Sequence, residues 1–405
     1  MSGSARPGGR VLIVIGVVLM ALTLRIAVAS LSPVIDRIAG DFPLPAALVG
    51  LIGMAPPAAF AAAGLLTPPL ERRLGLERLA LCAVVVAALG LAARSLAVNA
   101  VSLLVVTVVL FAAVGIGNVL LPGIAKKYFP DRVGVLTALY TTAMAVATFV
   151  PPLVAVPLAD SWGWRLSFTV WAAVAAAAIV PWIVITVRAR AFDAGLVERP
   201  RADVVRRLVR LPLAWALAAT FAVNSSVAYA AFAWLPVILV DVAHTTAQQA
   251  GALLALFAFM GLPCSFFVPL LVSRYRVVGA LYVVAVTSGI AGIAGLLFVP
   301  TVATPLWVAL LGLPPLLFPM LLVLIGLRTR THDTAVALSG FVQSIGYGFA
   351  ALAPLAIGLV HEATGEWTGS LILLGAVMTI AIPAGFVVAR GRTIEDEWEQ
   401  RHGAW

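Results

Sequence analysis

The sequence is poor in charged residues. Only 11% of its 405 residues are Asp, Glu, Lys or Arg, whereas 62% are hydrophobic and the mean hydropathy is +1.10. A soluble domain carries about 25% charged residues because its surface must face water. The composition therefore excludes an ordinary soluble enzyme and predicts that most of the outer surface faces lipid.

Cysteine and enzyme motifs are scarce as well. Cys82 and Cys264 are the only two cysteines, and both fall within apolar runs, which favours buried thiols over a disulfide or a metal site. No GxxxxGK[ST], HExxH or CxxC motif occurs, and GIGNVL at 115–120 is typical of close helix packing rather than of a nucleotide loop. We therefore expect no catalytic residues, no metal ligands and no cofactor.

Long apolar runs, in contrast, are abundant. A helix needs roughly 20 apolar residues to cross a bilayer. Twelve such runs are found at 11–32, 46–68, 78–97, 101–122, 135–158, 166–188, 212–238, 247–270, 277–299, 304–326, 334–359 and 368–389. The sequence therefore predicts an all-α membrane protein with twelve transmembrane helices.

Basic residues lie almost entirely on one side of these predicted spans. Of the 26 Lys and Arg residues, 22 share the side of the N-terminus, three lie opposite (Arg37, Arg94 and Arg165), and Arg25 lies within a span. Because cytoplasmic loops carry the excess of Lys and Arg, we expect a multi-pass protein of the inner or plasma membrane with both termini cytoplasmic. The net charge of +9 is then a topology signal, and no nucleic-acid partner is expected.

The chain divides at a basic stretch near its midpoint. The predicted parts are a cytoplasmic N-terminus (1–10), an N-terminal six-helix bundle (11–188), a cytoplasmic linker (189–211), a C-terminal six-helix bundle (212–389) and a cytoplasmic tail (390–405). An internal repeat supports two related halves, because GVLTALYTTAMAVATFVPPLVAVPLADSWGW (134–164) matches AVALSGFVQSIGYGFAALAPLAIGLVHEATGEW (335–367), each ending in a loop with an acid and a tryptophan. Such halves are typical of transporters, whose substrate site is expected between them.

Four segments resemble one group of transporters. They are TLRIAVASLSPVI (23–35), GNVLLPGIAKKYFP (117–130), LTALYTTAM (136–144) and AYAAFAWLPVILVD (228–241). Together they resemble the cyanate and 2-nitroimidazole permeases (CynX/NimT-like) of the major facilitator superfamily. The resemblance covers the whole chain and implies two pseudosymmetric six-helix bundles that work by alternating access.

The sequence departs from this family at two places. Thr23 and Ile26 stand where Asn and Pro of an N-L-R-P motif are expected. The loop between the second and third spans, GLLTPPLERRLGLER (64–78), has Pro68 at the acidic position of the superfamily's loop motif, which argues against the usual carboxylate latch. The residues expected to act in gating are Arg72, Arg73 and Arg78 in this loop and Asp36 at the outer mouth.

Arg25 is the strongest candidate for substrate binding. It lies deep in the first span, where a charged side chain costs at least about 2.5–3.5 kcal/mol and must face a cavity or a partner. Asp36 is too far away for a direct ion pair, because eleven residues of helix span about 16 Å. The planar guanidinium fork suits a small anion or a planar polar ligand. A packing role is the alternative.

Acidic residues and histidines are missing from the interior of the predicted spans. All 17 carboxylates and four histidines fall in loops, at helix ends or in tails, so we expect the ligand to supply negative charge. Transport is then expected by facilitated diffusion or exchange, or with a proton carried by the substrate. The other candidate ligand contacts are neutral: Asn118, Tyr140, Thr141, Asn224, Tyr229, Gln343 and Tyr347. Hydrogen bonding between helices is the alternative for each of them.

The expected function is that of a secondary active or facilitative transporter for a small polar or anionic solute, such as a cyanate-like anion or a nitroimidazole. A multidrug or toxic-compound exporter of the same superfamily is the first alternative. A membrane-embedded transferase is a distant one, since it would need catalytic acids or a metal cluster beside a large polar loop, and the sequence has neither. The expected partners are the small-molecule substrate and the lipid bilayer, and we expect a monomer.

Overall fold

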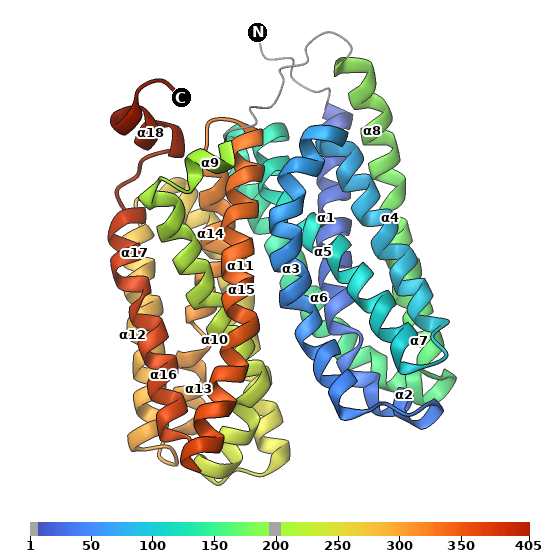
Figure 1. The fold of residues 1–405 in the computed structure, drawn as a ribbon, viewed down its shortest axis with the longest axis vertical. Helices are drawn as coiled ribbons and strands as arrows, with labels where there is room; N and C mark the ends of the chain where they lie inside the picture. Colours follow the sequence, from blue (N-terminus) through green and yellow to red (C-terminus); the bar gives the residue numbers. More distant parts are fainter. Residues whose placement is uncertain (1–6, 194–203) are drawn as a thin grey trace. The chain divides into compact units, whose positions relative to one another are not determined.

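The computed structural model describes residues 7–193 and 204–405 and is helical almost throughout (Figure 1). Residues 1–6 of the predicted N-terminus and 194–203 of the predicted linker lie outside the described residues. Within the described part, twelve helical segments are long and apolar enough to cross a membrane. Each of them overlaps one of the twelve predicted spans, which confirms the expected all-α architecture.

The chain forms two compact units. The first contains residues 1–132, 139–202 and 331–340, and the second contains 133–138, 203–330 and 341–405. The elements up to the linker are α1 (Pro7–Ala29), η1 (Ser32–Val34), α2 (Ile35–Asp41), α3 (Ala46–Leu74), α4 (Leu76–Ser95), α5 (Ala100–Tyr128), η2 (Pro130–Arg132), α6 (Val133–Trp162), α7 (Trp164–Ala177) and α8 (Ile179–Asp193).

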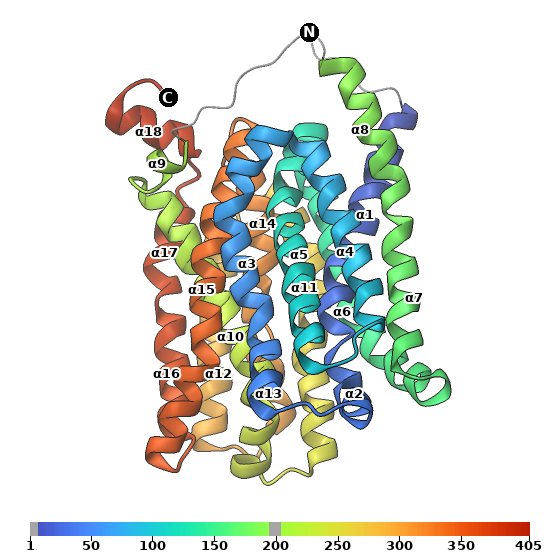
Figure 2. The same ribbon diagram turned by 45° about the vertical axis from the view of Figure 1, so that its right-hand side comes forward.

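The elements after the linker begin with a short helix. They are α9 (Val204–Leu208), α10 (Pro212–Ala243), α11 (Ala247–Arg274), α12 (Val278–Phe298), α13 (Thr304–Leu311), η3 (Pro314–Leu316), α14 (Leu317–Leu327), α15 (His332–Thr364), α16 (Thr368–Thr379), α17 (Ala381–Val388) and α18 (Ile394–His402). Within each unit the long helices run side by side along one direction, as both ribbon views show (Figures 1 and 2).

Close packing in the first unit centres on α5, which contacts α1, α3 and α4. Two glycines of α5 permit this. A Cβ on Gly115 would lie 2.6 Å from the Cβ of Ala63 on α3, and a Cβ on Gly117 would lie 2.6 Å from Cδ2 of Leu24 on α1. Both distances are too short for a real side chain, so these glycines bring the helix backbones together. The GIGNVL segment is therefore a packing motif, as predicted.

Several spans are not continuous helices. The first span ends its main helix at Ala29 and continues through η1, which contains Pro33, into α2. A proline has no backbone N–H and disfavours helix at the preceding residue, so the break is expected there. The tenth span is interrupted in the same way, because Pro314 and Pro315 lie in η3 between α13 and α14.

The internal repeat appears in the structure as a repeated hydrogen bond. In the first unit, the indole Nε1 of Trp164 donates to Oδ2 of Asp41 over 3.0 Å. In the second unit, Nε1 of Trp367 donates to Oδ2 of Asp241 over 2.8 Å. Each tryptophan follows the long helix of its repeat, and each aspartate lies at the end of the first span of its half. The two halves thus close one end of their bundles with the same contact.

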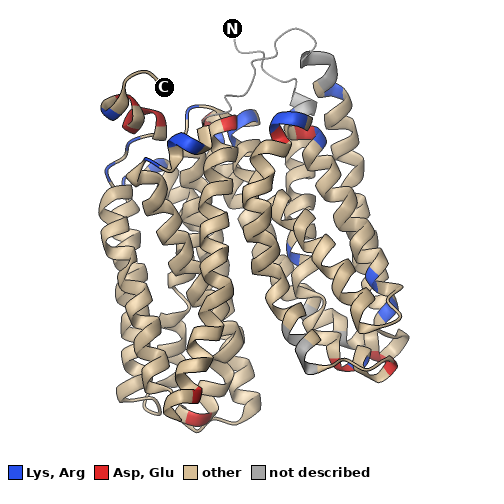
Figure 3. Cartoon of the chain, viewed as in Figure 1, with Lys and Arg blue, Asp and Glu red and all other residues tan. Residues whose placement is uncertain are grey.

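The surface has two kinds of region. Large apolar side chains such as Leu65, Phe349 and Phe386 are exposed along the spans, as expected of residues that face lipid. Charged residues gather at the helix ends instead, and in each unit Lys and Arg are concentrated at one end (Figure 3). In the described part of the second unit, the opposite end carries Asp and Glu but no Lys or Arg.

Candidate functional site

The first unit places Arg25 and Asn118 at one level of two packed helices. Arg25 lies on α1, one turn before this helix ends, and its side chain is half-buried. Asn118 lies on α5 and is buried. The two helices meet where Gly117 faces Leu24. Because Gly117 and Leu24 are the sequence neighbours of Asn118 and Arg25, the two polar residues lie at the same height along these helices.

Tyr140 and Thr141 belong to the same unit and lie on α6. Tyr140 is fully buried, and Thr141 is almost so. Their hydroxyl groups are therefore enclosed by protein rather than exposed to lipid. This position suits contact with a solute, and it equally suits hydrogen bonding between helices.

In the second unit, α10 and α15 bring two of the predicted residues into contact. The rings of Tyr229 and Tyr347 meet edge to face, with centroids 6.5 Å apart at 86°. Tyr347 also packs on Phe221, with centroids 5.0 Å apart. Phe221, Tyr229 and Tyr347 thus form an aromatic cluster, and the predicted amides Asn224 and Gln343 lie on the same two helices, α10 and α15.

The two amides of this region are buried. Asn224 follows Phe221 by about one turn of α10, and its Oδ1 accepts no hydrogen bond from the residues that the structure describes. Gln343 precedes Tyr347 by one turn of α15 and is 1% exposed. Aromatic rings beside amide groups are a surface suited to a planar polar molecule, since the rings contact its faces and the amides bind its edges.

Arg94 is a buried cation that the sequence interpretation missed. The basic-residue count assigned it to an outside segment, although it lies within the predicted span 78–97. In the structure it is fully buried on α4. Nε donates to Oγ1 of Thr107 over 3.1 Å, and Nη1 donates to the carbonyl oxygen of Ala27 over 2.6 Å.

The remaining contacts of Arg94 are aromatic. The guanidinium carbon lies 4.9 Å from the ring centroid of Phe111 and 5.9 Å from that of Phe168. Among the described residues, no carboxylate forms an ion pair with it, and Nη2 finds no hydrogen-bond partner. The cation is therefore held by a carbonyl of α1, a hydroxyl and two rings, which identifies Arg94 as a structural residue of the first unit.

The predicted gating residues lie at helix ends. Arg72 is half-buried in the last turn of α3, Arg73 and Arg78 are exposed nearby, and Asp36 is exposed on α2. Within the described ranges, none of these four forms an ion pair. Their role in gating stays a prediction.

The buried acids near this loop were not singled out from the sequence. Glu77 at the start of α4 is buried, its Oε1 lies 2.7 Å from Nζ of Lys127, and it accepts a 2.6 Å hydrogen bond from the Tyr128 hydroxyl. Both partners lie at the end of α5. Glu77 therefore fastens the beginning of α4 to the end of α5, while the acids keep to helix ends as expected.

Glu71 is the second buried acid of this loop. Its carboxylate lies with the side chains of His332 and Asp333, both in the 331–340 segment of the first unit, so that the potential ligand atoms are within 4.8 Å of one another. His332 Nε2 is already 2.9 Å from Oδ1 of Asp333. The positive charge of Lys127 favours the ionised form of both carboxyl groups, Glu71 and Asp333. A nearby ammonium group disfavours a bound cation, so this grouping does not change the expectation that the protein has no metal site.

Comparison with known proteins identifies the architecture. The family model of the Major Facilitator Superfamily matches residues 13–351. Among curated proteins, the 2-nitroimidazole transporter of Escherichia coli is 32% identical over 95% of this chain and 97% of its own. An uncharacterized transporter of Bacillus subtilis, YycB, is 30% identical over 97% of both chains. The cyanate transport protein CynX of E. coli is 25% identical over 69% of this chain and 73% of its own.

Solved structures agree in fold. The fucose:proton symporter of E. coli has 16% sequence identity and a TM-score of 0.69, with 93% of this chain and 99% of that chain covered. The proton:xylose symporter XylE has 12% identity and a TM-score of 0.69, with 98% of this chain and 100% of that chain covered. At such identities the similarity is one of fold alone, with twelve helices in two pseudosymmetric bundles.

Proposed function

The chain belongs to the major facilitator superfamily, and we propose that it is a transporter of a small planar or anionic solute that works by alternating access. The two relatives with named substrates are a 2-nitroimidazole transporter and a cyanate transport protein. Both substrates are small, and both are planar or linear with polar atoms at the periphery. The proposal extends this substrate class to the present chain, with Arg25 as the principal residue that binds the solute.

The observation that carries the proposal is the half-buried Arg25 on α1, at the level of Asn118 on α5. The stem of a partly enclosed arginine can pack against apolar neighbours while its planar guanidinium binds a polar solute. When the guanidinium binds a carboxylate-like or nitro-like edge through two N–H groups, the hydrogen bonds are short and directional. Asn118 would add a neutral donor and acceptor beside it.

We propose that the second unit contributes the aromatic cluster of Phe221, Tyr229 and Tyr347 together with Asn224 and Gln343. The free acceptor of Asn224 supports this role, because a buried amide oxygen costs about 1–3 kcal/mol when it is left without a hydrogen bond. A ligand with a donor group would satisfy it. Thr141 and Tyr140 complete the proposed set on the first unit.

The orientation in the membrane is part of the same proposal. We propose that the end of each unit where Lys and Arg are concentrated faces the cytoplasm (Figure 3). Both termini and the 189–211 linker are then expected on that side of the cell membrane, because most of the basic residues lie in these segments and in the loops on the same side. No interior carboxylate or histidine is available in the middle of the spans for proton coupling. Facilitated diffusion, exchange, or entry of a protonated substrate is therefore the expected mode.

Arg25 variants test the proposal directly. Ligand-induced thermal stabilisation of the purified protein should be measured with cyanate, 2-nitroimidazole and imidazole for wild type, Arg25→Lys and Arg25→Ala. Lysine supplies one point charge without the fork, so its affinity should fall at least about tenfold, or roughly 1.4 kcal/mol. Alanine should abolish the stabilisation. Both variants are expected to fold, which far-ultraviolet circular dichroism would verify.

The matched control is Arg132→Ala, because Arg132 is an exposed arginine of η2 in the same unit. It removes the same charge without touching the proposed site, so its ligand response should equal that of wild type. Unaltered stabilisation of Arg25→Ala would remove Arg25 from the site. It would also remove the main support for a planar or anionic substrate.

A further inference from the structure

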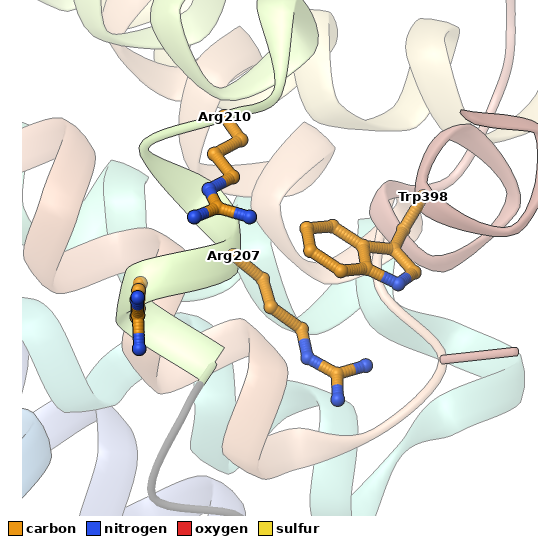
Figure 4. Close-up of a pocket in the computed structure, with 4 residues that line it drawn as sticks. Arg207, Arg210 and Trp398 are labelled. Carbon is orange, nitrogen blue, oxygen red and sulfur yellow. The ribbon is translucent and has the colours of Figure 1, made fainter. Parts of the chain in front are cut away.

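The second unit has a cavity of about 290 Å³ at its arginine-rich end. Three arginines and one tryptophan line it: Arg206, Arg207, Arg210 and Trp398. The arginines come from α9 and the turn after it, and the tryptophan comes from α18. Figure 4 shows the side chains of Arg207, Arg210 and Trp398 turned toward one space. The proposed transport function does not use this cavity.

Buried apolar anchors hold the arginine wall in place. Val204 and Leu208 on α9 are buried, and so is Leu211, which directly precedes α10. With these positions turned inward, Arg206 and Arg210 are left exposed at the mouth of the cavity. The arrangement is therefore a consequence of how the short helix packs, and it does not depend on one flexible side chain.

The tryptophan wall is fastened to the same unit. Ile394 of α18 is fully buried, and its backbone N–H donates to the carbonyl of Arg328 over 2.8 Å. Oε2 of Glu397 accepts a 3.0 Å hydrogen bond from the backbone N–H of Leu213, in the first turn of α10. Because α9 leads into α10, this bond fixes Trp398 opposite the arginines.

The acids of α18 have partners other than the arginines of the cavity. Asp396 and Glu399 bind the guanidinium of Arg330, at distances from 2.5 to 2.9 Å. Glu397 bonds to α10 and lies 3.5 Å from Nη2 of Arg401. Among the residues that the structure describes, neither Arg206 nor Arg210 forms an ion pair. Among the described residues, the cavity is thus lined by three cations and by no carboxylate.

The indole adds an ordered aromatic surface. The guanidinium carbon of Arg207 lies 4.9 Å from the ring centroid of Trp398 and 5.2 Å from that of Trp405. His402 stacks on Trp398 with ring centroids 4.2 Å apart. These contacts hold Arg207 and Trp398 in a defined geometry, which lowers the entropy that a ligand would lose on binding them.

We propose that this cavity binds the phosphate group of an anionic ligand. Guanidinium groups bind phosphate oxygens through paired, charge-assisted hydrogen bonds, and three of them line a volume large enough for a phosphate with its attached organic group. The indole provides an apolar wall for that group. Arg210 lies two residues before Pro212, where the seventh span begins, so the site is at the level of lipid headgroups. This position favours an anionic phospholipid over a soluble phosphate as the source.

Binding to delipidated protein in detergent tests the proposal. The probes are dihexanoyl phosphatidylglycerol and inorganic phosphate, and calorimetry measures the affinity of wild type, Arg206→Gln/Arg210→Gln, and Arg276→Gln. Arg276 is an exposed arginine of the same unit outside the cavity, so its variant is the matched control. We expect the double variant to bind the phospholipid at least about tenfold more weakly than wild type, and the control to bind it equally well.

The two probes separate the sources of the phosphate group. Binding of the phospholipid alone assigns a headgroup site, and binding of both probes assigns a general phosphate site. The proposal would be overturned if wild type bound neither probe. It would also be overturned if wild type and the double variant bound the phospholipid equally well. An equal loss in Arg276→Gln would also overturn it, because surface charge alone would then explain the effect. If the double variant does not fold, Arg206→Gln and Arg210→Gln are measured separately, and each is expected to bind the phospholipid about threefold more weakly than wild type.

Discussion

Arg94→Lys is expected to destabilise the protein more than Arg94→Met, although lysine keeps the charge. Arg94 is fully buried, and its guanidinium uses its shape as well as its charge. Nε and Nη1 reach two acceptors on different helices, Thr107 and Ala27, while the flat face lies against Phe111. An ammonium group can satisfy one of these acceptors and cannot stack on the ring in the same way.

The contacts of Arg94 give the expected magnitudes. Lysine loses a hydrogen bond to a charged donor, worth about 1.5–3 kcal/mol, and most of a desolvated cation–π contact, worth up to about 2 kcal/mol. It still carries a buried cation, so we expect a loss of about 3 kcal/mol. Methionine loses both hydrogen bonds, but it also removes the cost of burying a cation, which is several kcal/mol. The net loss should be near 1 kcal/mol.

Thermal unfolding in detergent measures the difference. At about 2–4 °C per kcal/mol for a unit of this size, Tm should fall by roughly 6–12 °C in Arg94→Lys and by roughly 2–4 °C in Arg94→Met. Arg132→Lys is the control, since Arg132 is exposed, and its Tm should not change. If Arg94→Lys were as stable as wild type, or more stable than Arg94→Met, the positive charge alone would determine the stability. The argument that the guanidinium also stabilises the unit through its shape would then be refuted.

Two further predictions concern orientation and pH. In a protein with Cys82 and Cys264 replaced by alanine, an impermeant maleimide added to intact cells should label Gln248→Cys and not Arg276→Cys, and the reverse pattern would contradict the cytoplasmic assignment of the arginine-rich ends. Hydrogen bonds from Thr393, and then from Arg330, lower the pKa of Asp396 to about 2, and the hydrogen bond from Arg330 lowers the pKa of Glu399. Because these pKa values lie below their unfolded values, the contribution to stability is complete above about pH 4 to 5 and is lost as the pH falls toward about 2. Hydrogen-exchange protection of residues 394–402 should decline in that window, and constant protection down to pH 2 would contradict it.

Span positions follow from the sequence because apolar length is a direct requirement of the bilayer. The breaks within spans do not follow so easily. A hydropathy pattern is continuous through 304–326, whereas the backbone changes from α13 to η3 and α14 at Pro314 and Pro315. Likewise, α5 continues to Tyr128, beyond the predicted limit at 122. Its backbone hydrogen bonding runs past the apolar part and through Lys126 and Lys127. Hydropathy identifies what lies in lipid, but hydrogen bonding decides where a helix ends.

Long-range contacts explain why only part of the candidate site could be predicted. The repeat in the sequence indicated that each long helix is followed by a tryptophan. It did not indicate the partners, since Asp41 is 123 residues from Trp164 and Asp241 is 126 residues from Trp367. Asn224 and Gln343 were predicted as ligand contacts, and the structure shows that both are buried, but their contact with a ligand stays a prediction. The arginine and tryptophan cavity joins α9 to α18, whose sequences contain no motif that would pair them.

Arg94 and the break in the first span are physically linked. Where α1 ends, the last carbonyl groups lack the N–H donors that a continuing helix would supply. The carbonyl of Ala27 is one of these, and Nη1 of Arg94 donates to it. The cation also offsets the negative end of the helix dipole. Because Arg25 lies two residues before Ala27 on the same turn, Arg94 stabilises the helix end from which Arg25 extends. If the solute is an anion bound at Arg25, as proposed above, this cation also reduces the repulsion between the ligand and the negative end of the helix dipole.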